Sequence, residues 1–180
     1  MNTEALANTR IGKIFIRIMS VIMESRLRYK FFGPARILMG TEIRQGQTVL
    51  EIGCGTGFFT LPAAELLGAK GSLVAMDILP ASVETVTKKV QTANIKNVSV
   101  IKGNALDTKL DSESLDMILI LGVIPAPMLP MDQLLSEMHR ILKAGGIMAV
   151  WPPSWVHKPI VRSGLFTLSS RKNGVSNYKK

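Results

Sequence analysis

The chain has 180 residues, of which 47% are hydrophobic and 19% are charged, a composition typical of one globular domain rather than of a disordered chain. No apolar run free of charge and proline is long enough to cross a membrane, and the N-terminus lacks the pattern of a secretory signal. The single cysteine, Cys54, excludes internal disulfides and a multi-cysteine metal site. We therefore expect a cytoplasmic protein and no metal.

The net charge of +9 is concentrated at the two ends of the chain. Residues 1–40 carry seven Lys or Arg against two acids, and residues 155–180 carry six and no acid. Residues 41–154 carry nine Lys or Arg against eleven Asp or Glu and are slightly acidic. Basic ends favour an anionic partner, either a lipid headgroup or a nucleic acid, although the C-terminal lysines fit a solubilising surface equally well.

An amphipathic helix is predicted near the N-terminus. Apolar residues recur at helical spacing over residues 11–30, and basic side chains occupy much of the remaining surface. Gly33-Pro34 ends this pattern, and a second short helix is expected over residues 35–41. We expect residues 1–40 to form a helical lid over a domain of residues 41–180, with contact between the first helix and a membrane surface as the alternative.

After this segment the sequence alternates between strand and helix patterns, which predicts a doubly wound, mostly parallel sheet. Asn173-Gly174 is a strong hairpin signal and predicts that the sheet ends in an antiparallel hairpin. The expected strands are 48–52, 72–76, 98–102, 115–121 and 147–151, the last opened by a turn at 144–146, followed by the hairpin strands 165–172 and 175–180. The expected helices are 58–67, 80–93 and 132–142.

The stretch Glu51-Ile52-Gly53-Cys54-Gly55-Thr56-Gly57 joins the first strand to its helix. Its three alternating glycines let a ligand lie directly on the backbone, and the free N–H groups of the following helix face that ligand. Phe58 stands where a dinucleotide fingerprint needs glycine, and the carboxylate of Glu51 repels phosphate. The stretch therefore favours a cofactor without a pyrophosphate and with cationic groups, and S-adenosylmethionine is such a cofactor.

This stretch and the landmarks after it resemble the class I S-adenosylmethionine-dependent methyltransferases. The resemblance is closest to small methyltransferase-domain enzymes related to quinone and phospholipid-headgroup methyltransferases, and it covers about residues 40–180. It implies a Rossmann-like sheet of seven strands in the order 3-2-1-4-5-7-6. It also implies S-adenosylmethionine as the cofactor and S-adenosylhomocysteine as its product.

Asp77 ends the second strand, where its carboxylate can accept both ribose hydroxyls of an adenosine cofactor, although it could equally be an acid at a helix start. The resemblance implies that Ile78 lies against the adenine and that Glu51 approaches the methionine amino group through water. Asn104 stands where the family often has an aspartate, and it keeps a carbonyl acceptor for the adenine amino group. The expected cofactor-binding residues are Glu51, Gly53, Cys54, Gly55, Thr56, Gly57, Asp77, Ile78, Asn104, Ala105, Leu121 and Gly122.

The loop after the fourth strand, residues 122–127, carries no acid or histidine and lacks the Asn/Asp-Pro-Pro-aromatic motif of enzymes that methylate base amines. Methyl transfer is a displacement at a sulfonium, so positioning and desolvation can supply most of the catalysis. His157 is the one candidate base, and otherwise the catalytic residues are unknown. The residues expected to hold the acceptor are Phe15, Met19, Met23, Tyr29, Phe32, Trp151 and Trp155.

The sequence thus predicts a methyltransferase for a small-molecule or lipid-like acceptor, with no specific nucleic acid as a partner. Two alternatives stay open. One is an RNA or protein methyltransferase, which the basic ends favour and the absent base-amine motif disfavours. The other is a non-catalytic regulatory or partner subunit that binds S-adenosylmethionine, which the loop without catalytic side chains allows. The acceptor and the oligomeric state are not specified by the sequence.

Overall fold

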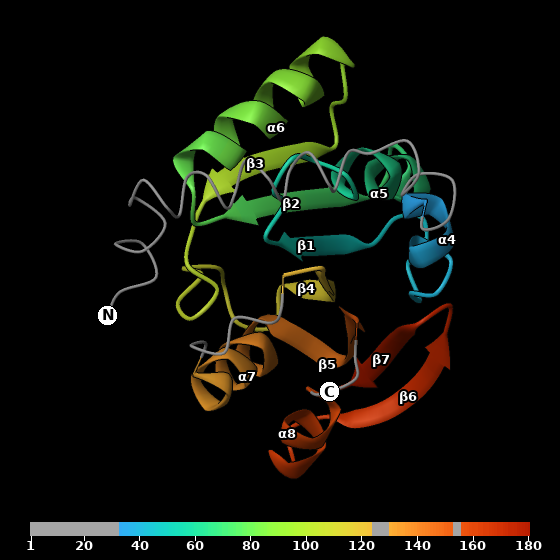
Figure 1. Cartoon of the computed structure of the whole chain (residues 1–180), viewed down its shortest axis with the longest axis vertical. Helices are drawn as coiled ribbons and strands as arrows, with labels where there is room; N and C mark the ends of the chain where they lie inside the picture. The colour runs from blue at the N-terminus through green and yellow to red at the C-terminus, as the bar shows by residue number, and fades with distance from the viewer. Residues whose placement is uncertain (1–32, 124–129, 153–155) are drawn as a thin grey trace.

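A mixed sheet of seven strands lies at the centre of the computed structural model, which describes residues 33–123, 130–152 and 156–180 (Figure 1). The strand order is β3-β2-β1-β4-β5-β7-β6, and β7 is antiparallel to both of its neighbours whereas the other pairs are parallel. The strands are β1 Thr48–Ile52, β2 Ser72–Asp77, β3 Val98–Lys102, β4 Leu115–Leu121, β5 Leu142–Trp151, β6 Thr167–Lys172 and β7 Val175–Lys179. The predicted Rossmann-like sheet, its strand order and its C-terminal hairpin are confirmed.

Helices cover both faces of the sheet (Figure 1). They are α4 Pro34–Leu38, α5 Thr60–Leu67, α6 Pro80–Thr92, α7 Met131–Ile141 and α8 His157–Arg162. Side chains alternate along each strand, so β1 sends Val49 to the core beneath α4 and α5 and Leu50 to the core beneath α7. Among the described helices, none has both the length and the apolar character that a membrane span requires.

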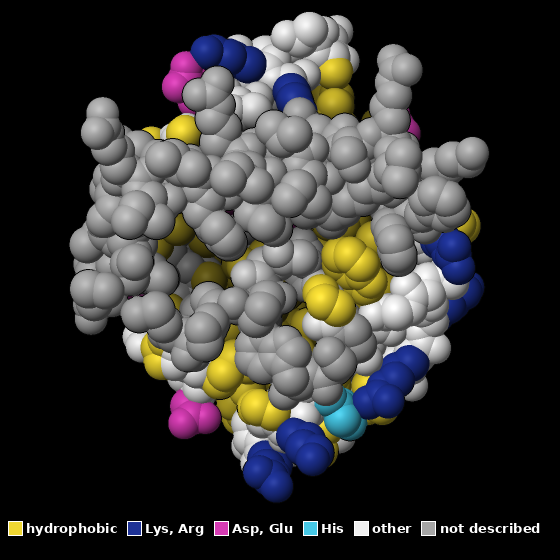
Figure 2. Space-filling model, in the orientation of Figure 1, with side chains coloured by type: hydrophobic (Ala, Val, Ile, Leu, Met, Phe, Trp, Pro, Cys, Tyr) yellow, Lys and Arg dark blue, Asp and Glu magenta, His cyan; other side chains and the backbone are white. Residues whose placement is uncertain are grey.

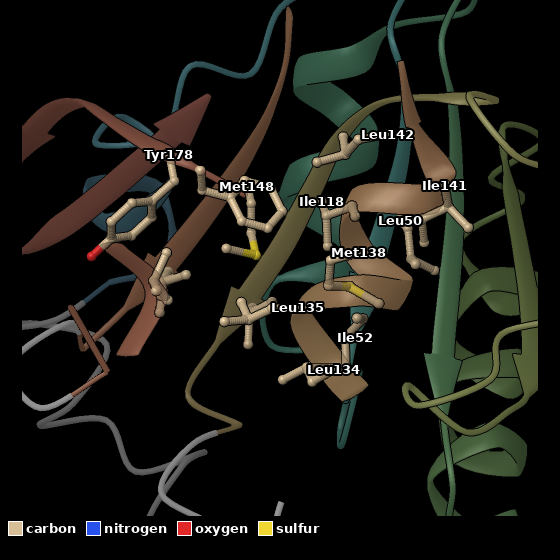
Figure 3. Close-up of a cluster of buried hydrophobic side chains, with 14 of the residues drawn as sticks. Leu50, Ile52, Ile118, Leu134, Leu135, Met138, Ile141, Leu142, Met148 and Tyr178 are labelled. Atoms are coloured by element: carbon tan, nitrogen blue, oxygen red, sulfur yellow. The ribbon is translucent and has the colours of Figure 1, made fainter. Parts of the chain in front are cut away.

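The core beneath α7 shows why this helix forms where it does (Figure 3). Its buried residues follow helical spacing and therefore form one apolar face, while the opposite face is exposed. That face packs on the apolar side chains of β1, β4 and β5, which point to the same side of the sheet (Figure 3). The residues in contact are Leu134, Leu135, Met138 and Ile141 of α7 with Leu50, Ile52, Ile118 and Met148 of the sheet.

The structure differs from the sequence-based expectation in several local features. The helix expected from residue 58 begins at Thr60, because the glycine-rich turn continues through Gly57, whose N–H donates to the carbonyl of Cys54 at 2.8 Å. The turn predicted at residues 144–146 is wrong: β5 begins directly after α7, and the register shifts between Leu115 and Met117. Gly145, with a φ of +77°, permits this irregular backbone.

Two helices near the chain ends also differ from expectation. The short helix expected over residues 35–41 is α4, which begins at Pro34 and ends at Leu38. No helix was expected over α8, whose six residues are too few for a clear periodic pattern. The predicted lid falls, apart from α4, outside the described residues.

We predict that Leu135→Ala lowers the free energy of unfolding by about 2–5 kcal/mol, because Leu135 is fully buried and its truncation leaves a cavity. The matched change Leu66→Ala, at an exposed leucine of α5, should alter it by about 0.5 kcal/mol or less. Urea denaturation followed by circular dichroism measures both. Equal losses for the two variants would contradict the core assigned here.

Candidate functional site

A cavity of about 280 Å³ opens at the carboxyl ends of β1 and β2. This position adjoins the point between β1 and β4 where the strand order reverses, which is where open α/β sheets bind ligands. The described residues of its wall come from strand ends and the loops after them: Ile52, Gly53, Met76, Asp77, Ile78, Gly103, Asn104, Ala105, Leu106, Val123 and Pro130. The wall thus combines an apolar surface with one carboxylate and exposed backbone.

The glycine-rich turn is fixed against the neighbouring strands. The N–H groups of Gly53 and Cys54 both donate to the carbonyl of Met76 on β2, at 2.8 and 3.0 Å. Gly53 has a φ of +71°, and a Cβ at this position would lie 2.5 Å from Cγ2 of Val123. Only glycine therefore fits residue 53, and its bare backbone forms part of the cavity wall.

Asp77 connects three segments around the cavity. Its Oδ2 accepts a hydrogen bond from the N–H of Gly55 at 2.9 Å, and its Oδ1 accepts one from the N–H of Leu79 at 2.9 Å. The carboxylate is buried, lines the cavity, and keeps a second lone pair on each oxygen. The contact with Leu79 is that of an acid at a helix start, and the predicted contact with a ribose remains compatible with it.

Glu51 lies beneath the turn and is 2% exposed. The hydroxyl of Thr60 donates a hydrogen bond to its Oε2 at 2.6 Å. Burial raises the pKa of Glu51 to about 8, against the lowering effect of the Thr60 hydrogen bond, and the charge of Asp77 acts in the same direction as burial. Near pH 7 this carboxyl is therefore mostly protonated, and a cation placed beside it would favour its ionised form.

Lys89 of α6 is a contact that the sequence did not reveal. Its Nζ donates to the carbonyl of Thr56 in the glycine-rich turn at 2.9 Å. The sequence offers one indication of this contact: Lys89 is next to Val90, which together with Val86 packs against the sheet. Cys54 packs in that same small cluster, where burial raises its thiol pKa, so it acts as a small apolar residue of the turn.

The loop after β3 closes the other side of the cavity. Asn104 uses its side-chain carbonyl to accept the N–H of Leu106 at 3.0 Å, which shapes this loop. Six wall residues were not predicted, although all but Pro130 are next to a predicted cofactor-binding residue in the sequence: Ile52, Met76, Gly103, Leu106, Val123 and Pro130. Five predicted cofactor residues do line it: Gly53, Asp77, Ile78, Asn104 and Ala105.

Other predicted residues are not among the described residues of the cavity wall. Gly122 donates its N–H to the carbonyl of Trp151 at 2.7 Å, which joins the ends of β4 and β5. The Trp151 ring packs on Phe59, with centroids 6.3 Å apart. Nδ1 of His157 lies 3.0 Å from the hydroxyl of Tyr178, so its role as a base stays a prediction.

The remaining predicted acceptor residues, Phe15, Met19, Met23, Tyr29, Phe32 and Trp155, fall outside the described residues. The cofactor-binding roles of Glu51, Cys54, Gly55, Thr56, Gly57, Leu121 and Gly122 stay predictions as well. Within the described ranges, no three His, Cys, Asp or Glu side chains are grouped closely enough to hold a metal ion.

Residues 43–172 match the sequence profile of a family described as methyltransferase domain. The demethylmenaquinone methyltransferase of Listeria welshimeri is 30% identical over 149 residues, which cover 78% of this chain and 61% of that enzyme. The enzyme of the same name from Staphylococcus epidermidis is 29% identical over 129 residues, 70% of this chain and 51% of that enzyme. The chain thus spans less than two thirds of the length of these curated relatives.

Solved structures share the fold. A structure described as a SAM-dependent methyltransferase from Aquifex aeolicus superposes with a TM-score of 0.75 and 21% identity, over 92% of this chain and 96% of that one. The [4+2]-cyclase SpnF superposes with a TM-score of 0.71 and 15% identity, over 89% of this chain and 73% of that one. At these identities the comparison shows the fold alone, and a fold shared with a cyclase does not determine the reaction.

We predict that Glu51 makes folding stability fall with rising pH between 4.5 and about 8. The folded chain keeps the Glu51 proton up to about pH 8, whereas the unfolded chain releases it near the ordinary value of 4.5. Because the folded state binds more protons in this window, the free energy of unfolding should fall by up to about 1.4 kcal/mol per pH unit through this group. Glu51→Gln, which cannot ionise, should remove that contribution.

Urea denaturation of the wild type and of Glu51→Gln at several pH values in this window measures the difference in slope. Glu65→Gln, at an exposed position of α5, is the matched control and should keep the wild-type slope. If Glu51→Gln also kept that slope, Glu51 would be ionised in the folded protein.

Proposed function

This chain belongs to the methyltransferase-domain family, and from that premise we propose that it is an S-adenosylmethionine-dependent methyltransferase for a small-molecule acceptor. One observation carries the proposal. The cavity at the carboxyl ends of β1 and β2 places bare glycine backbone beside two buried carboxyl groups, Glu51 and Asp77. This arrangement suits a ligand that is both a nucleoside and a cation.

The cavity fits S-adenosylmethionine better than a dinucleotide. The wall residues that the structure describes include no Lys or Arg, and the buried carboxyl group of Glu51 lies beneath the turn that would have to hold a pyrophosphate. Asp77 would accept the ribose hydroxyls with the lone pairs that Gly55 and Leu79 leave free. Ile78 and Ala105 would flank the adenine. The backbone of the glycine-rich turn, with Glu51 beneath it, would hold the methionine end.

When bound, S-adenosylmethionine supplies a methyl group on a sulfonium, which an acceptor atom displaces. The residues of this chain would bind the cofactor and the acceptor, orient them and exclude water, because a displacement needs the reacting atoms aligned and close. Val123, which touches Gly53, and Pro130 give the cavity an apolar side near the glycine-rich turn. We place the acceptor on this side.

A quinone-like aromatic is the acceptor that we propose. The support is the sequence similarity to proteins named demethylmenaquinone methyltransferase and the apolar side of the cavity. An aromatic hydroxylated acceptor activates its own ring carbon, so a dedicated base is not required from the wall. That agrees with Asp77 being the one titratable side chain among the described wall residues, where both its oxygens already accept hydrogen bonds.

We predict that S-adenosylhomocysteine raises the melting temperature of the protein and that NAD does not, because the site lacks a described cation for a pyrophosphate. Asp77→Ala should weaken S-adenosylhomocysteine binding by about 1.5–3 kcal/mol, the range for hydrogen bonds to a charged group. Asp111→Asn, at an exposed acid remote from the wall, is the control and should bind as the wild type does. Stabilisation by NAD alone would refute the proposed cofactor.

We also propose that residues 1–40 cover the acceptor side of the cavity as a lid. The support is the amphipathic pattern in the sequence and the short connection between β5 and β6, in which the structure describes only α8 as a helix. Deletion of residues 1–30 should leave S-adenosylhomocysteine affinity within a few-fold and abolish methyl transfer, because an open site admits water.

Labelled S-adenosylmethionine incubated with a reduced naphthoquinone, phospholipid or RNA measures that transfer for the full chain and the truncated chain. The proposal expects label in the naphthoquinone with the full chain only. Label in RNA would refute the acceptor class, and full activity of the truncated chain would refute the lid.

A further inference from the structure

One end of the molecule, formed by α8 and the β6–β7 hairpin, carries an excess of positive charge, although Glu42 accepts hydrogen bonds from Ser169 and Ser170 of β6 and Glu113 pairs with Lys180. Residues 156–180 contain no Asp or Glu. Lys158 and Arg162 of α8 and Arg171 of β6 are exposed. Figure 2 shows Lys and Arg side chains gathered around this end, while the acidic side chains in that view lie elsewhere. An anionic partner would therefore meet a net positive charge at this end of the molecule.

The exposed side chains of α8 and β6 share one side of the sheet. Tyr178 of β7 pairs with Leu168 of β6, and its hydroxyl lies 3.0 Å from Nδ1 of His157 in α8. Directly paired residues point to the same side, so Leu168 lies on the α8 side. Arg171, which pairs with Ser176, also points there and interacts electrostatically with Tyr178. In Figure 1, α8 lies beside the start of β6.

Exposed aliphatic side chains lie among these cations. Val161 is 45% exposed, between Lys158 and Arg162 on α8, and Leu168 is 40% exposed on β6. They are two of the four large hydrophobic side chains exposed within the described residues. Cations with interspersed aliphatic groups are typical of surfaces that bind anionic bilayers, since the aliphatic groups enter the headgroup boundary. Binding of single-stranded nucleic acid would instead favour exposed aromatic rings for stacking.

We propose that Lys158, Val161, Arg162, Leu168 and Arg171 form a docking face, the α8–β6 face, for an anionic lipid bilayer. The cations approach the lipid phosphates, and Val161 and Leu168 enter the interfacial region. β6 runs parallel to β5, so Arg171, near the end of β6, lies toward the carboxyl ends of the parallel strands, where the cavity opens. The proposal depends on neither the cofactor nor the acceptor of the reaction.

The test is flotation of the full chain with vesicles of phosphatidylcholine alone and of phosphatidylcholine mixed with phosphatidylglycerol. Binding is expected only to the mixed vesicles and should weaken with salt. The triple variant Lys158→Gln/Arg162→Gln/Arg171→Gln should lose on the order of 100-fold in vesicle affinity, since each cation near an anionic surface contributes about fivefold. The double variant Val161→Ser/Leu168→Ser should weaken the part of the vesicle binding that remains at high salt.

The control variant Lys70→Gln/Lys88→Gln/Lys96→Gln removes the same charge from exposed positions elsewhere and should bind vesicles as the wild type does. An unchanged circular dichroism spectrum and melting temperature of each variant show that it is folded. The proposal is overturned if the wild type does not bind mixed vesicles, or if the triple variant and the control lose equal affinity. It is also overturned if the triple variant loses RNA binding but keeps vesicle binding.

Discussion

The Asp77 carboxylate is the contact on which the site depends. Its two oxygens accept the N–H of Gly55 in the glycine-rich turn and the N–H of Leu79 at the start of α6. A single buried side chain at the end of β2 thus holds the turn after β1 and the helix after β2 in fixed positions. Without it, two partly buried N–H groups would lose their protein partners. The cavity wall is built on this arrangement.

The electrostatics of the site follow from the same burial. Glu51 and Asp77 lie in neighbouring parallel strands and are both buried, and together with desolvation this proximity favours the neutral form of Glu51. Lys89 contacts the turn through the carbonyl of Thr56. A cationic group bound above Gly53 would favour the ionised form of Glu51, which desolvation disfavours. A phosphate would instead add its negative charge to that of Asp77. The burial of these two carboxyl groups therefore agrees better with the proposed cationic cofactor than with a phosphate.

Much of the fold could be predicted because its determinants are local. β1, β3 and β4 have the bounds expected from apolar runs flanked by turn residues. The Asn173-Gly174 turn has φ angles of +50° and +77°, the left-handed backbone that this dipeptide favours in hairpins. β5 was expected to begin five residues too late, because the pairing of Leu142 with Leu115 of β4, which starts the strand before the irregular stretch at Gly145, has no local sequence pattern.

The site was predictable only in part for a related reason. Gly53 and Asp77 belong to a contiguous motif and to a strand end, which a sequence shows directly. Val123 and Pro130 reach the cavity from separate elements, and Lys89 of α6 reaches the turn after β1. Such contacts depend on the angles at which elements pack, and periodicity along one element does not specify those angles.

The protonation of Glu51 offers the most direct test of this account. Calorimetric titration of the protein with S-adenosylmethionine near pH 7, in buffers of different ionisation enthalpy, measures the protons exchanged on binding. Since Glu51 is mostly protonated in the free protein and would ionise beside the methionine ammonium, the account predicts release of about one proton per cofactor bound. Glu51→Gln should bind without this release. Binding to the wild type with no proton release would contradict the account.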